Sequence, residues 1–343
     1  MTRIVSYNIL AGGYSLRENG ASRAQQLTKI IRSVQPDIIG LVEATHPSIK
    51  EKPMVIEEIA EELGMQLTMG GDATHKHDYQ LALLTRLPIV YTKIHPRPGL
   101  LTKPLLEVCV EEANGERLTV FVTHLSAAFN QGWAGAHIRT REVHEILRIM
   151  EPQRQQGIPH LLMGDFNSLA PDDNFKASSL LRYIVDLDQY RRDHKLVDGH
   201  PYMNGVVPPQ LRFLKPILRT IPRSKILTTL FDAAASLYAP RGCIRVLREA
   251  GYIDSYRHLH PDSLGFTCPA SAPAGRIDYI FASPTLVQRL EACYEITEGD
   301  GLPGDQASDH LAITATFGLP VQPAKSPSAT GQSSTELDSA ATH

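Results

Sequence analysis

The chain lacks closely spaced cysteines. None of its four cysteines belongs to a C-x-x-C pair, and their scatter argues against a zinc knot or a disulfide framework. The four are Cys109, Cys243, Cys268 and Cys293. We therefore expect reduced thiols in a cytoplasmic protein.

Long apolar runs are missing as well. No stretch approaches the roughly 20 apolar residues that span a bilayer. The first predicted strand begins almost at the initiator Met, with no charged and then apolar leader before it, so we expect no signal peptide. These absences predict a soluble protein, which we expect to be a monomer.

The apolar content of the chain is sufficient for a large core. Of its 343 residues, 42% are hydrophobic. Domains average about 150 residues, but a single two-layer sandwich of this size is a common exception. We expect one catalytic domain over residues 1–319. Residues 320–343 are rich in Ser, Thr, Ala and Pro and poor in large apolar side chains, which predicts a disordered tail.

Three β-prone runs in the C-terminal half join polar clusters. The stretches are LLMGDFNS, GRIDYIF and ASDHLAI. They place Asp165, Asn167, Asp278, Asp309 and His310 at predicted strand ends. Carboxylates, an amide and an imidazole gathered in one place are what a hard cation and an attacking water require. The pattern indicates a metal-dependent hydrolase.

Predicted strands in the N-terminal half have the same layout. They span residues 4–10, 36–44 and 118–125, and the polar residues near their exits are Asn8, Glu43 and His124. Helical periodicity covers residues 22–33, 54–63 and 139–150, between the strands. Helices placed between strands in this way predict a mixed α/β sandwich.

In this order the motifs resemble those of the endonuclease/exonuclease/phosphatase superfamily, which includes deoxyribonuclease I, inositol polyphosphate 5-phosphatases and neutral sphingomyelinases. The matching segments are SYNIL, LVEA, THLS, GDFN, RIDYIF and the triplet Ser308-Asp309-His310. Residues 81–89 resemble a further strand and turn of that superfamily, and the match covers roughly residues 3–318. The resemblance implies a four-layer α/β/β/α sandwich with two mixed β-sheets, and catalysis with Mg²⁺ or Mn²⁺.

The residue types suggest which side chains hold the metal ion. Glu43 is the expected principal ligand, because Mg²⁺ takes one or two carboxylates and keeps several waters. We expect Asp309 to be a further carboxylate of the metal site, and Asn8 to hold the metal shell or a phosphate oxygen. Arg276 is left open between a structural salt bridge and a phosphate contact.

The remaining polar residues fit the chemistry of an attacking water. Asp165 and Asn167 lie two residues apart, so they project to the same side of an extended strand end. We expect Asp165 to orient or deprotonate the water and Asn167 to donate to a phosphate oxygen. His310 is expected to contact the phosphate or exchange a proton, with Asp278 fixing its tautomer. His124 is suited to protonating the leaving oxygen or to stabilising the transition state.

The segment from residue 176 to residue 248 is a basic insertion between two of these motifs. It holds 13 Lys and Arg against 5 Asp and Glu, so it carries about +8 in a protein whose net charge is −3. Pro216 and Pro222 predict that it forms short helices. Three interpretations stay open: a helical cap with a solvated basic face, a contact with an anionic membrane surface that presents a phospholipid headgroup, or a contact with a nucleic-acid backbone.

The predicted function is hydrolysis of a phosphodiester by in-line attack of water. The alternatives are a phosphomonoesterase acting on a soluble or lipid-linked phosphate, and a nuclease acting on DNA or RNA. The segment Thr123-His124-Leu125, where abasic-site endonucleases usually carry a tyrosine motif, and the acidic overall balance disfavour dedicated abasic-site repair. A catalytically inactive binding module is the most distant alternative, because no motif position is missing.

Overall fold

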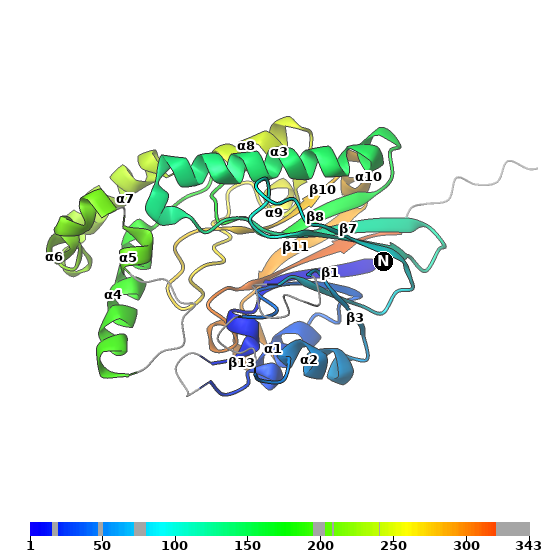
Figure 1. Cartoon of the computed structure of the whole chain (residues 1–343), viewed down its shortest axis with the longest axis horizontal. Coiled ribbons are helices and arrows are strands. Elements are labelled where there is room, and N and C mark those ends of the chain that lie inside the picture. The colour runs from blue at the N-terminus through cyan, green and yellow to red at the C-terminus, as the bar shows by residue number, and fades with distance from the viewer. Residues whose placement is uncertain are drawn as a thin grey trace, which may run out of the picture.

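The computed structural model describes residues 1–15, 20–46, 51–71, 80–194, 203–207, 209–239 and 241–319. Within these ranges two six-stranded sheets lie face to face, and helices cover the outer face of each sheet (Figure 1). This confirms the predicted four-layer α/β/β/α sandwich. The predicted tail, residues 320–343, lies outside the described residues.

The first sheet has the strand order β11-β14-β1-β2-β4-β3. Its strands are β1 (Thr2–Asn8), β2 (Ile38–Val42), β3 (Gln66–Met69), β4 (Ala82–Thr85), β11 (Leu290–Ile296) and β14 (Ala312–Phe317). β1 and β2 are parallel, and all other pairs in this sheet are antiparallel. Because β14 runs against β1, the segment that leads into β14 lies beside the end of β1.

The second sheet has the order β5-β6-β7-β8-β10-β9. Its strands are β5 (Ile89–His95), β6 (Leu105–Glu111), β7 (Arg117–His124), β8 (His160–Asp165), β9 (Ile253–Asp254) and β10 (Asp278–Ala282). The central pair, β7 and β8, is again parallel, and β10 runs against β8. Both sheets are therefore mixed, as predicted.

The core between the sheets is made of branched aliphatic side chains from both. Ile4, Ile38 and Val42 of the first sheet belong to one buried cluster with side chains of β6, β7, β8 and β10. At Gly40 on β2 an added Cβ would lie 2.3 Å from Cε of Met163 on β8. The sheets approach so closely there that only glycine fits without displacing the methionine.

Two helices cover the outer face of each sheet. They are α1 (Ala24–Arg32) and α2 (Val55–Leu63) on the first sheet, and α3 (Trp133–Gln155) and α8 (Gly242–Glu249) on the second. The helices predicted over 22–33 and 54–63 are confirmed, because their apolar stripes face the sheet. α3 is longer than the predicted 139–150 at both ends, since its first residues carry no apolar period and the helix continues past Pro152, which lies in its last turn.

The predicted strands end slightly earlier than expected from their apolar pattern. β1 stops at Asn8 and β2 at Val42. The turns that follow the two strands explain this. Leu10 and Glu43 have φ angles of 51° and 55°, in the left-handed region, which an extended strand cannot continue through. The sequence pattern cannot reveal this change of backbone region.

Residues 177–238 of the predicted insertion form a separate group of helices at one end of the sandwich (Figure 1), whereas its last helix, α8, packs on the second sheet. They are α4 (Ala177–Asp193), α5 (Met203–Val206), the 3₁₀ helix η5 (Pro209–Leu214), α6 (Lys215–Leu218), the 3₁₀ helix η6 (Ile221–Arg223) and α7 (Lys225–Tyr238). The predicted breaks are confirmed, because Pro216 and Pro222 each lie in the first turn of a short helix. A small apolar cluster, which includes Leu181, Ile184 and Ile221, holds the group together.

Short elements complete the described fold. They are η1 (Ala11–Gly13), η4 (Phe129–Gln131), α9 (Ser255–Leu259), α10 (Pro284–Val287), β12 (Glu298–Gly299), β13 (Leu302–Pro303) and η7 (Gly304–Gln306). All four cysteines are free thiols. Within the described ranges, no helix combines the length and the apolar character needed to cross a membrane.

Candidate active site

Three polar residues stand side by side on adjacent strands of the second sheet. The register pairs His124 at the end of β7 with Asp165 at the end of β8, and Asp165 with Asp278 at the start of β10. Gly164 permits this alignment: its φ is 141°, and an added Cβ would lie 1.9 Å from the carbonyl oxygen of Thr123. The GDFN motif therefore needs glycine for the close approach of β7 and β8.

The carboxylate of Asp165 is the centre of the site. Its Oδ1 accepts a hydrogen bond from the backbone N–H of Asn167 at 2.8 Å, and its Oδ2 accepts one from Nδ2 of Asn8 at 3.1 Å. The same Oδ2 lies 3.6 Å from Nε2 of His124 and 4.0 Å from Nε2 of His310. Those two distances exceed hydrogen-bond length, so a water or phosphate oxygen can bridge them.

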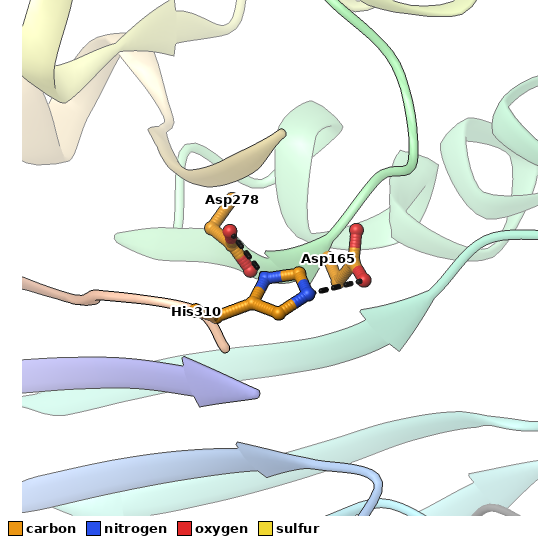
Figure 2. Close-up of side chains that lie close together, drawn as sticks. All are labelled: Asp165, Asp278 and His310. Atoms are coloured by element: carbon orange, nitrogen blue, oxygen red, sulfur yellow. Dashed lines mark hydrogen bonds and ion pairs between the residues drawn. The ribbon is translucent and has the colours of Figure 1, made fainter. Parts of the chain in front are cut away.

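The His310 ring lies between two carboxylates, as Figure 2 shows. Its Nδ1 forms a 2.8 Å contact with Oδ2 of Asp278, on the side opposite to Asp165. Ser308 fixes the loop that carries this histidine, because its hydroxyl donates to the backbone oxygen of Asn8 at 2.8 Å. The end of β1 and the segment before β14 are thus joined directly at the site.

Burial and neighbouring charge give the two facing groups unusual acidities. Burial raises the pKa of Asp165 to about 7, and the nearby Asp278 carboxylate adds to the rise. For His310, burial alone would lower the pKa, but the Asp278 carboxylate and the hydrogen-bonded Cys268 thiol raise it well above the usual histidine value. The geometry therefore favours a charged imidazole beside a carboxyl of reduced acidity.

His124 is held in the opposite protonation state. Burial, with added repulsion from Lys103 and His310, lowers its pKa well below the usual histidine value. Among the described residues, its buried Nδ1 has no hydrogen-bond partner. A neutral ring that faces Asp165 through Nε2 is consistent with both observations.

Glu43 and Asp309 lie at the border of this cluster, and each is half-buried. Oε2 of Glu43 accepts a hydrogen bond from the backbone N–H of Ala11 at 3.1 Å, which leaves Oε1 outside that bond. Burial raises the pKa of Asp309. The buried guanidinium of Arg23 interacts electrostatically with both carboxylates.

Asn167 is held by the backbone around it, in addition to the contact with a phosphate that the sequence predicts. Its φ of 48° places it in the left-handed region, and its Nδ2 donates to the backbone oxygen of Leu125 at 3.0 Å. The backbone strain of such a residue costs about 1–3 kcal/mol and is common at functional sites. One amide N–H of Asn167 thus joins the exits of β7 and β8.

Three groups at the site were not predicted from the sequence. Lys103 acts electrostatically on Glu43 and Asp165, Cys268 is hydrogen bonded to His310, and Arg23 donates to the backbone oxygens of Ile9, Leu10 and Tyr14. Lys103 stands in an irregular segment before β6, and no motif marks it. Cys268 belongs to no recognisable cysteine motif, so the sequence pointed to neither Lys103 nor Cys268 as a site residue.

Arg276 is part of the buried framework. Its side chain is fully buried, and its guanidinium lies 2.9 Å from Asp173 and 2.7 Å from Asp254. Nε of Arg276 also donates to Asp173 at 3.1 Å. Of the two interpretations left open by the sequence, the structure favours the salt bridge.

The site contains the donor atoms that a hard divalent cation requires. Asp165, Asp278 and His310 offer ligand atoms that all lie within 4.8 Å of one another, and all three residues are buried. Nδ1 of His310 is already engaged with Asp278, which leaves Nε2 of His310 and the carboxylate oxygens as the available donors. Oxygen ligands suit Mg²⁺ and Mn²⁺, and a cation would relieve the repulsion between the buried acids.

Comparisons with known proteins agree with this architecture. The sequence matches the family described as "Endonuclease/Exonuclease/phosphatase family" over residues 5–310. An AP endonuclease from Archaeoglobus fulgidus is similar in structure, with a TM-score of 0.58 and 15% identity, covering 93% of this chain and 100% of that one. No curated protein matches the chain.

Two further solved structures have the same fold. The 3' phosphatase NExo from Neisseria, bound to a product DNA hairpin, has a TM-score of 0.55 and 16% identity over 93% of this chain and 100% of that one. Truncated TDP2 from Caenorhabditis elegans has a TM-score of 0.55 and 16% identity over 93% of this chain and 97% of that one. At such identities the likeness concerns the fold.

Proposed function

The chain belongs to the endonuclease/exonuclease/phosphatase family, whose members hydrolyse phosphoester bonds, and from that premise we propose that it cleaves a phosphodiester with a divalent metal ion and an in-line water. One observation carries the proposal. Asn8 at the end of β1, His124 at the end of β7 and His310 in the segment before β14 converge on a single oxygen, Oδ2 of Asp165. Such a polar centre is arranged for a reacting water and a charged phosphate.

Asp165 is the proposed base that orients and deprotonates the attacking water. A carboxyl with a pKa of about 7 is matched to proton transfer near neutral pH, whereas an ordinary aspartate is too weak a base. The backbone N–H of Asn167 fixes Oδ1, and Asn8 fixes the orientation of Oδ2. Asn8 and Asn167 thereby act as positioning residues for the carboxylate.

His310 is the proposed donor to the phosphate. Its contact with Asp278 through Nδ1 turns Nε2 toward Asp165, where the substrate would be attacked. Asp278 therefore acts as the orienting residue of the histidine, as the carboxylate of a catalytic triad does. His124 is neutral, so we assign it to hydrogen bonding with the transition state and assign proton donation to His310.

Glu43, Asp309 and Asn8 are the proposed metal-holding residues. Glu43 keeps Oε1 available, while the Ala11 N–H holds Oε2 in place. When bound, the ion supplies positive charge that neutralises the phosphate oxygens and lowers the pKa of a coordinated water. Mg²⁺ and Mn²⁺ are the proposed cofactors, because both favour oxygen donors.

The test compares substrates that differ in one ester bond. In Mg²⁺ or Mn²⁺ the protein should hydrolyse bis-para-nitrophenyl phosphate faster than para-nitrophenyl phosphate, because the diester lacks the second ionised oxygen of the monoester. Faster hydrolysis of the monoester would favour a phosphomonoesterase. Plasmid DNA, single-stranded oligonucleotides and an abasic duplex added to the same assay test the nuclease alternative and the expectation against abasic-site repair. A cytoplasmic location and a monomeric state stay predictions.

The Asp278 and His310 pair should behave as one unit. We expect Asp278→Asn and His310→Gln each to lower kcat on the diester by about 10²-fold, and the double variant to lose little more than either single one. Once the histidine is gone, the carboxylate has nothing left to orient. Asp172→Asn serves as the control, because Asp172 pairs with Arg248 on the exposed surface and its effect should add independently. Additive losses for Asp278 and His310 would separate the two roles.

A further inference from the structure

The outward face of helix α7 is apolar. Ile226, Leu230, Ala233 and Leu237 follow the spacing of one helical face, and all four are exposed. Leu237 is 90% exposed, Ile226 74% and Leu230 63%. A helix on a globular surface normally turns such a stripe toward the core, so this orientation needs a partner outside the described chain.

The orientation of α7 is fixed by its other face. Asp232 accepts hydrogen bonds from the backbone N–H and the hydroxyl of Ser178, at 2.6 and 2.8 Å. Phe231, next to Asp232, packs against the apolar cluster of the insertion. The helix therefore cannot turn its apolar stripe inward without breaking these contacts.

The segment before α7 repeats the same combination of apolar and basic side chains. Phe213 on η5 is 74% exposed and Ile217 on α6 is 60% exposed. No Asp or Glu occurs from residue 199 to residue 231, while five Lys and Arg occur there. We call the exposed members the insertion surface: Arg212, Phe213, Ile217, Arg223, Lys225, Ile226, Leu230 and Leu237.

The insertion surface belongs to the end of the sandwich that carries the candidate active site. The chain passes from Asp165 at the end of β8 to the start of α4 at Ala177 within a short segment. α5 contacts η4, which follows the end of β7 and its His124. Figure 1 shows the insertion helices projecting beyond the sheets at this end.

We propose that the insertion surface docks on an anionic lipid bilayer. Apolar side chains flanked by Lys and Arg match the apolar interior and the negative headgroups of such a surface, as in amphipathic helices that lie in the membrane interface. The charge has one sign over the whole surface, so the complementary partner is a continuous negative surface. Docking does not depend on hydrolysis and holds whether or not the proposed reaction is confirmed.

Other occupants fit less well. A second copy of the chain would place the same basic residues opposite one another, which opposes association. A single-stranded nucleic acid is held by aromatic side chains that stack on its bases, and Phe213 is the one exposed aromatic side chain among the described residues of 209–231. The phosphates of a duplex offer nothing apolar to match the exposed stripe of α7. The C-terminal segment of the chain is not a suitable occupant either. It has few apolar residues beyond Leu319, and it starts far from the insertion surface, because Phe317 pairs with Thr2 at the opposite end of β1.

The test is flotation of the full chain with vesicles, in EDTA so that turnover plays no part. We expect binding to vesicles of phosphatidylcholine with phosphatidylglycerol, weaker binding to phosphatidylcholine alone, and release by salt, since screening weakens contacts between exposed charges. Arg212→Gln, Arg223→Gln and Lys225→Gln together should lower the partition coefficient about a hundredfold, at about fivefold for each basic side chain near an anionic leaflet. The matched control is Lys29→Gln, Arg86→Gln and Arg117→Gln, which removes the same charge from exposed positions on the sandwich.

A second set of variants tests the apolar stripe. Ile226→Gln, Leu230→Gln and Leu237→Gln keep residues that favour helix and should abolish flotation, because each apolar side chain contributes about tenfold or more on insertion. Val90→Gln, Ile94→Gln and Leu100→Gln, at exposed apolar positions outside the insertion, should leave flotation unchanged. Circular dichroism confirms that each variant is folded.

Three results would overturn the proposal. Equal flotation of the charge variant and its control would show that the basic residues are not used. A dimer that disappears in the stripe variant, without vesicle binding by the parent protein, would assign the surface to a second copy. Salt-sensitive binding of an oligonucleotide that the charge variant loses, again without flotation, would assign it to nucleic acid.

Discussion

The substitution Asp165→Asn is expected to lower kcat on a diester by about 10³-fold or more, because an amide can neither take the proton of the water nor carry the charge that Asn8 and Asn167 orient. The same substitution should raise the stability of the metal-free protein. A residue that costs stability while it supports turnover is the expected sign of a functional group held in an unfavourable environment.

The direction of the stability change follows from the acidity of Asp165. Its folded-state pKa is about 7, above the usual 3.8, so the ionised carboxylate destabilises the folded state as pH rises through this interval. Near neutral pH and above, removal of the charge should raise the unfolding free energy in EDTA by up to about 4 kcal/mol, at about 1.4 kcal/mol for each pKa unit. At pH 3 the advantage should vanish, because the carboxyl is protonated in both states.

Thermal unfolding in EDTA across this pH range is the measurement. Asp232→Asn is the control of opposite sign, because Asp232 accepts two hydrogen bonds from Ser178 and its loss should cost about 1 kcal/mol. A destabilised Asp165→Asn protein, or one of near-normal kcat, would remove Asp165 from its proposed role.

Metal removal should have the other large effect. In excess EDTA we expect no detectable turnover of the diester, and full recovery with Mg²⁺ or Mn²⁺, because the buried acids cannot hold an anionic phosphate among them without a cation. Metal should also raise the melting temperature, since an ion that binds the folded state alone stabilises it. Turnover that persists in chelator would contradict the mechanism.

Glu43→Gln tests the metal assignment within this experiment. It keeps the shape of the side chain and its contact with Ala11 but removes the ligand charge, so the Mg²⁺ concentration for half-maximal activity should rise by about tenfold or more. The metal-induced rise in melting temperature should shrink in parallel. Glu111→Gln, at an exposed position on β6, should change neither quantity. An unchanged metal requirement in Glu43→Gln would show that Glu43 is not the principal metal ligand.

The sequence predicted those features of the fold that are local. An apolar run followed by a polar cluster locates a strand exit, and the register then gathers the exits because β7 and β8 are parallel and β10 runs against β8. Asp278 and His310 were paired from their residue types, and the 2.8 Å contact agrees with that pairing. The roles assigned to these side chains stay predictions until variants are measured.

What could not be predicted depends on contacts between residues far apart in the chain. Lys103 reaches the site from an irregular segment, and the hydrogen bond from Asn8 to Asp165 spans most of the N-terminal half. Apolar periodicity likewise cannot tell which way a stripe faces. On α7, Leu237 and Ile226 point outward, because the other face of the helix is held by the contact of Asp232 with Ser178.

The close approach of the two sheets at Gly40 and Met163 has a thermodynamic consequence for the reaction centre. One sheet and its connections supply Asn8 and His310, and the other supplies Asp165 and Asp278, so neither half holds a working fraction of the site. A fluctuation that separates the sheets would part Asn8 and His310 from Asp165 and Asp278. We therefore expect the population of active molecules to depend on the docking of the two sheets.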